Sequence, residues 1–69
     1  MLVDVTGLRK RFRDYPNIVR FLDLLIARGS YGMLDRIART TNADVIAMGM
    51  TLQDLDDLAC SLLPSHMQK

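Results

Sequence analysis

Hydrophobic residues recur along this chain at the three- and four-residue spacing that places them on one side of an α-helix. Leu8, Phe12 and Tyr15 share such a face in the first predicted helix. Pro16 ends this helix and starts a second one, because proline suits the first helical position and disfavours helix in the residue before it. The second helix is predicted to run to Gly29, which is well placed to end it.

Two further helices are predicted between residues 30 and 49. Ser30 is a capping residue for a third helix, and Asn42 breaks it. A short fourth helix over residues 43–48 then ends at Gly49.

The last helix has the clearest start and stop. Thr51 and Asp54 have the spacing of a capping box, and Pro64 ends the helix. Its apolar stripe is predicted to face the core, and its polar residues to face water. The stripe consists of Leu52, Leu55, Leu58, Ala59, Leu62 and Leu63, and the polar side of Gln53, Asp54, Asp56, Asp57 and Ser61.

These elements predict an all-α fold, a small bundle of four to five short helices in a single domain over residues 1–69. Residues 1–6 are assigned to an N-terminal arm and residues 64–69 to a C-terminal tail. The second and fourth helices are apolar around most of their circumference, so they should be buried on most sides. We therefore expect an intertwined or side-by-side homodimer, or else a surface held for another protein. The predicted dimer interface is Phe21, Leu22, Leu25, Ile26, Val45, Ile46, Met48 and Met50.

Size and composition favour association as well. A chain of 69 residues is near the lower limit for a stable core, although 49% of its residues are hydrophobic. Cys60 and His66 are the only residues of their types, which excludes an internal disulfide and a structural zinc site. A partner subunit is the remaining source of extra stability.

Charge is segregated along the chain. Residues 1–39 contain eight basic residues against four Asp, whereas residues 40–68 contain four Asp and no Lys or Arg. The densest basic stretch, residues 8–15, combines arginines with aromatic residues, a combination enriched at protein interfaces. It is interpreted first as a solvated basic face, with a surface for an acidic protein and then one for nucleic acid as the alternatives. The candidate partner-binding residues are Arg9, Arg11, Phe12, Arg13, Tyr15 and Tyr31.

The segment from Leu34 to Met50 resembles a helix-turn-helix in outline. Ala38 stands for the small residue of the first helix, Asn42 for the turn and Met48 for the apolar residue of the second helix. The resemblance implies that this second helix enters the major groove of DNA. However, the second helix of this segment offers Asp44, Val45, Ile46, Ala47 and Met48 instead of the basic and amide side chains that read bases, so helix packing explains the spacing better.

Catalytic chemistry finds little support. The eight Asp form no convergent pair, and Cys60 has no basic neighbour in sequence that could activate its thiol. Met33, Met48 and Met50 fit either an adaptable binding surface or ordinary core packing. No catalytic residue, metal or cofactor is therefore assigned, and we expect a cytoplasmic protein rather than a membrane protein, because the longest apolar run is far too short to span a bilayer.

The sequence as a whole predicts a non-catalytic interaction protein that binds another protein and thereby regulates, inhibits or adapts it. In size and helical makeup it resembles the small inhibitors and anti-activators that phages and bacteria direct at transcription factors or other host proteins. The alternatives are a small helix-turn-helix DNA-binding regulator and a subunit of a larger complex whose apolar surface meets a different chain.

Overall fold

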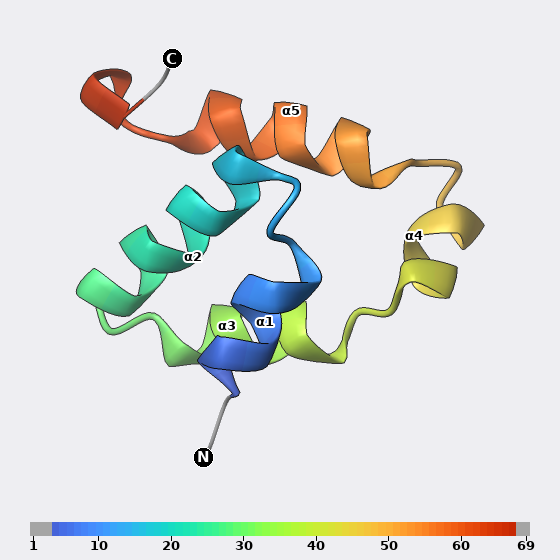
Figure 1. The fold of residues 1–69 in the computed structure, drawn as a ribbon, viewed down its shortest axis with the longest axis horizontal. Helices are drawn as coiled ribbons and strands as arrows, with labels where there is room; N and C mark the ends of the chain where they lie inside the picture. Colours follow the sequence, from blue (N-terminus) through green and yellow to red (C-terminus); the bar gives the residue numbers. More distant parts are fainter. Residues whose placement is uncertain (1–3, 68–69) are drawn as a thin grey trace.

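A computed structural model of the chain describes residues 4–67, which form helices joined by short turns. Figure 1 shows α5 along one side of the molecule and α3 along the other, with α2 connecting the two sides. The predicted all-α fold of four to five short helices is confirmed, with five α-helices in the described residues. The helices are α1 (Val5–Arg11), α2 (Pro16–Ala27), α3 (Tyr31–Arg39), α4 (Asn42–Ala47) and α5 (Leu52–Leu62), followed by a short 3-10 turn at Ser65–Met67.

The predicted helix ends are largely confirmed. Pro16 is the first residue of α2, and Gly29 follows α2 with a φ of +70°, in the left-handed region that glycine adopts without strain. Gly49 has the same role after α4, at a φ of +75°. The capping box of Thr51 and Asp54 opens α5 as expected.

Two helix starts differ from the prediction. The side chain of Asp4 accepts the backbone N–H of Gly7, so α1 begins at Val5 and the arm is shorter than residues 1–6. Thr41 forms a second capping box with Asp44, so Asn42 opens α4 instead of breaking α3. At the chain ends, residues 1–3 of the arm and 68–69 of the tail lie outside the described residues.

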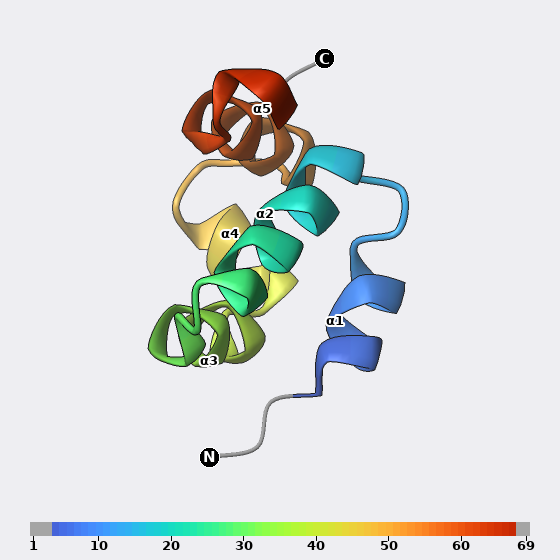
Figure 2. The same cartoon turned by 90° about the vertical axis from the view of Figure 1, so that its left-hand side faces the viewer.

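The core is centred on α2, which packs against both α5 and α3 (Figure 1). Leu22 of α2 and Leu34 of α3 are fully buried. Figure 2 shows α1 on one side of α2 and α3 on the other. The core cluster consists of Leu8, Phe12, Ile18, Leu22, Leu25, Leu34 and Ala59.

The chain itself covers part of the predicted dimer interface. Leu22, Leu25 and Val45 are buried within the single chain, which corrects the prediction that these three side chains face a partner. The fourth helix, in contrast, is not buried on every side. Ile46 is 72% exposed and Met48 61% exposed, because α4 lies at the edge of the molecule and turns only Val45 inward.

The buried polar group of the fold is a carboxylate. Asp56 of α5 was expected to face water, but its side chain is only 4% exposed. One of its oxygens accepts the backbone N–H of Ile18 at 3.0 Å, and the other accepts the side-chain amide of Asn17 at 3.0 Å. Arg20 in turn donates to the Asn17 amide oxygen at 3.3 Å.

This carboxylate acts as the cap of α2. In the described chain, the Tyr15 side chain at the cap position makes no hydrogen bond to the helix. The first turn of a helix has free N–H groups and a partial positive charge, both of which a carboxylate satisfies. Asp56 supplies it from α5, so one side chain joins the two helices that form the centre of the core.

We predict that Asp56→Ala destabilises the fold by about 2 kcal/mol, because it removes hydrogen bonds to a buried charged group and leaves the Ile18 N–H without a partner. Asp57→Ala, on the exposed side of the same helix, is the matched control and should change stability by less than about 0.5 kcal/mol. Urea unfolding followed by circular dichroism measures both. Equal losses for the two variants would contradict the capping role.

Candidate functional site

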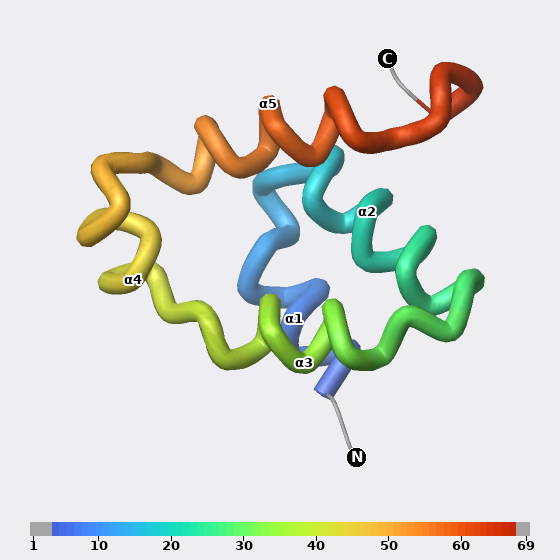
Figure 3. Tube along the Cα trace, turned by 180° about the vertical axis from the view of Figure 1, so that it is seen from behind, coloured from blue at the N-terminus to red at the C-terminus, as the bar shows by residue number. Residues whose placement is uncertain are grey.

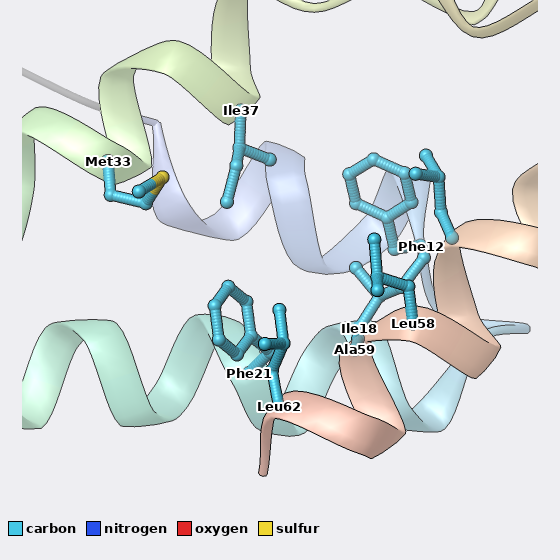
Figure 4. Close-up of a pocket in the computed structure, with 9 residues that line it drawn as sticks. Phe12, Ile18, Phe21, Met33, Ile37, Leu58, Ala59 and Leu62 are labelled. Carbon is cyan, nitrogen blue, oxygen red and sulfur yellow. The ribbon is translucent and has the colours of Figure 1, made fainter.

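An apolar groove opens between α3 and α5, with α2 beside it and α1 behind it (Figure 4). Figure 3 shows the molecule from the side opposite to the view of Figure 1, with α3 and α5 nearest the viewer on the two sides of the groove. The groove has a volume of about 240 Å³. It is lined by Phe12, Ile18, Phe21, Met33, Ile37, Leu55, Leu58, Ala59 and Leu62.

The floor of the groove belongs to the core, whereas its rim is exposed. Phe12 and Ala59 are buried at the bottom. On the rim, Met33 of α3 is 45% exposed, and Leu58 and Leu62 of α5 are 50% and 58% exposed. Large apolar side chains on the rim of an apolar hollow are typical of a surface that binds another molecule.

Helical spacing puts these side chains on the rim. Met33 and Ile37 are four residues apart on α3, and Leu58 and Leu62 are four residues apart on α5, so each pair shares one face of its helix. A second hollow of similar size shares Phe12, Ile37 and Leu55 with the groove. It extends the apolar surface towards Met48 and α4.

This surface can bind another molecule by burying apolar area. All nine lining residues have hydrocarbon, aromatic or thioether side chains, which provide no strong hydrogen-bonding group and no titratable group. Burying the remaining exposed surface of a half-exposed Leu or Met contributes about 1 kcal/mol. The groove therefore suits the apolar side chains of a polypeptide.

Sequence reasoning located this groove only in part. Of the predicted interface residues, Phe21 lines the groove, and Val45 and Met48 line the adjoining hollow. Ile26 is packed beside the core, and Met50 is half-buried. Leu58 and Leu62 were assigned to the core and are exposed instead. The apolar stripe of α5 is wide enough to face both the core and the groove. The width of this stripe is the feature of the sequence that could have indicated an exposed apolar rim.

The basic helix α1 is largely tied to the rest of the chain. Arg9 forms an ion pair with Asp23 of α2. Arg11 donates to the side-chain oxygen of Asn42 at 2.8 Å, and its guanidinium lies 4.5 Å from the ring centre of Phe12. Figure 1 shows α1 in front of α3, where these contacts hold it.

The predicted partner-binding residues therefore have different environments. Phe12 is buried in the core and contributes to the floor of the groove, so it is not part of an exposed basic surface. Tyr15 is half-buried, whereas Arg13 and Tyr31 are exposed. Lys10 of α1 and Arg13 of the turn that follows it make no ion pair with any described residue, and both are exposed.

The segment that resembles a helix-turn-helix forms α3 and α4, but α4 has only six residues. Its exposed side presents Asn42, Ala43, Asp44, Ile46 and Ala47, and the side-chain oxygen of Asn42 already accepts a hydrogen bond from Arg11. The backbone N–H of Thr41, 2.8 Å from the carboxylate, lowers the pKa of Asp44 below its usual value, and the Thr41 hydroxyl lowers it further. An ionised carboxylate on this helix repels phosphate, so the geometry does not favour DNA binding here.

No protein-family model, curated protein or solved structure matches this chain. Among the described residues, no helix is both long enough and apolar enough to cross a membrane. Three or more potential metal-ligating side chains do not converge anywhere between residues 4 and 67.

We predict that Thr41→Ala raises the pKa of Asp44 part of the way towards its usual value, since the hydroxyl is lost and the backbone N–H remains. The Asp44 pKa is lower in the folded chain than in the unfolded chain. Asp44 therefore stabilises the fold fully above its unfolded pKa, and this contribution disappears as the pH falls through the folded pKa.

An NMR titration of the Asp44 carboxyl carbon checks the shift. Thr40→Ala is the matched control, because the Thr40 hydroxyl donates to the Arg36 carbonyl and does not contact Asp44. An Asp44 pKa that is the same in the wild type and in Thr41→Ala would show that the hydroxyl has no part in the shift.

Proposed function

We propose that this protein is a small non-catalytic binding protein that attaches to other polypeptides through the groove between α3 and α5. The observation that carries the proposal is the exposed apolar rim of Met33, Leu58 and Leu62 around a groove whose whole lining is apolar. Such a lining binds apolar side chains by excluding water, without selecting a small polar substrate.

An amphipathic helix is the ligand that suits this shape. The groove is bordered by two helices, and a third helix can place its apolar face between them with side chains at three- and four-residue spacing. Binding of this kind covers part of the partner's surface and thereby regulates, inhibits or adapts the partner. We extend the proposal to the class of small regulators or inhibitors of host proteins, and to a homodimer as one form of the assembly.

The proposal places a DNA-binding role second, because α4 is short and carries the ionised Asp44. A subunit of a larger complex is a special case of the same idea, in which the partner in the groove is permanent. Whether the polypeptide partner is transient or permanent, the groove is the surface that makes contact.

Site-specific photo-crosslinking tests the proposal in cells that produce the protein naturally. A photoreactive amino acid at position 58, on the rim, should form a covalent adduct with a polypeptide. The same amino acid at position 53 is the matched control, because Gln53 is equally solvent-exposed but lies on another side of α5. Met33→Asp on the opposite wall should abolish the adduct at position 58. Absence of an adduct at position 58, or equal adducts at both positions, would refute the proposal.

A further inference from the structure

The two walls of the groove carry opposite charges next to their apolar rims. On α3, Arg36 follows Met33 by three residues and is exposed. On α5, Asp54 precedes Leu58 by four residues and is also exposed. Residues three or four apart are neighbours on a helix surface, so each charge flanks a rim side chain of its own wall.

Both charged groups have capacity for a further partner. The Arg36 side chain makes no ion pair or hydrogen bond within residues 4–67, whereas Arg39 is already paired with Asp35 at 3.0 Å. One oxygen of Asp54 accepts the Thr51 N–H at 2.9 Å, which leaves the other oxygen free to accept from a cation.

The directions of α3 and α5 determine which residues of the two walls lie at the same end of the groove. In Figures 1 and 3, α3 and α5 run in opposite directions along the two sides of the groove. The end of α3 that carries Arg36 is therefore at the same end of the groove as Asp54, at the start of α5. Met33 and Leu62 lie towards the other end (Figure 4).

We propose that the occupant of the groove is a second copy of this chain, related by a two-fold axis that runs along the groove. Rotation about this axis places α3 of each copy on α5 of the other, in antiparallel orientation. Met33 of one copy then meets Leu58 and Leu62 of its partner, and Arg36 meets Asp54. Each contact occurs twice, as in any two-fold interface.

Charge selects this axis over the other face-to-face arrangement. A two-fold axis across the groove would place α3 on α3 and α5 on α5 with their directions reversed, so Arg36 of one copy and Asp54 of the other would lie at opposite ends of the groove and could not pair. Complementary charges fix the register of an interface, and the axis along the groove is the arrangement that brings these two charges together. The self-complementary pattern of apolar and charged positions is why we assign the groove to a second copy rather than to an unrelated helix.

The inference rests on the proposed function, since it takes the groove to be a polypeptide-binding surface. It also places α1 away from the interface. In the dimer the grooves face each other, and α1 lies on the opposite side of each copy (Figure 2). The exposed residues Lys10 and Arg13 then lie on the outside of the dimer.

A first experiment measures the mass of the purified chain by light scattering over a dilution series. The wild type should be a dimer. Met33→Asp should be a folded monomer, because Met33 is already half-exposed in the single chain but its carboxylate replacement would be buried in the dimer. Ala38→Asp, at an exposed position on another side of α3, is the matched control and should remain a dimer.

A second experiment tests the pairing of α3 with α5. Arg36→Asp and Asp54→Lys should each weaken the dimer by roughly tenfold, since each variant turns two attractive contacts into repulsive ones. The chain that carries both changes regains both attractions, so its dimer should recover to within about threefold of the wild type. If Arg36→Asp dimerises as tightly as the wild type, or if the double variant does not recover, the pairing is wrong.

Asp54 also caps α5, so circular dichroism must show that each variant is folded. If Asp54→Lys unfolds, Asp54→Asn takes its place, because its amide oxygen can still accept the Thr51 N–H. In that case Arg36→Asp combined with Asp54→Asn should dimerise more tightly than Arg36→Asp alone, and failure to do so overturns the pairing.

The outcomes separate this inference from the proposed function. A monomeric wild type, together with an adduct at position 58 to a different polypeptide, overturns the dimer and leaves the binding function standing. A monomer that forms no adduct at position 58 refutes both.

Discussion

The hydrogen bonds of Asp56 to the start of α2 are the constraint on which the rest of the structure depends. They fix how α5 is rotated about its own axis, because the carboxylate must point at the first turn of α2. Ala59, three positions on, then faces the core, whereas Leu58 is turned roughly 200° away from Asp56. The same bond that caps α2 thus places an apolar side chain on the rim of the groove.

The contacts of α1 provide the other half of this arrangement. The ion pair of Arg9 with Asp23 joins α1 to α2, and the hydrogen bond of Arg11 to Asn42 joins it to α4. Exposed contacts of this kind contribute little stability individually. These contacts matter because they fix the position of α1, which places Phe12 at the bottom of the groove between α3 and α5. Without α1 in this place the floor of the groove would lose Phe12.

Helix boundaries could be read from the sequence because local chemistry determines them. Pro16, Gly29 and the pair Thr51 and Asp54 act within one turn of chain, and each has the predicted role. The rotation of α5 could not be read, because it depends on a hydrogen bond across 38 positions. A stripe defined by apolar residues alone assigns Asp56 to water, and the rim of the groove consequently to the core.

Stability and occupancy of the groove are coupled in this molecule. Phe12, Ile18 and Ala59 belong both to the core cluster and to the lining of the groove, so a ligand in the groove packs directly on the core. A chain of this length buries only a small core, so its folded state has little stability of its own. A ligand that binds only the folded state shifts the folding equilibrium towards the folded state. A polypeptide in the groove therefore adds to the hydrophobic core as well as occupying a binding site, and the exposed rim is the part of the core that the single chain leaves uncovered.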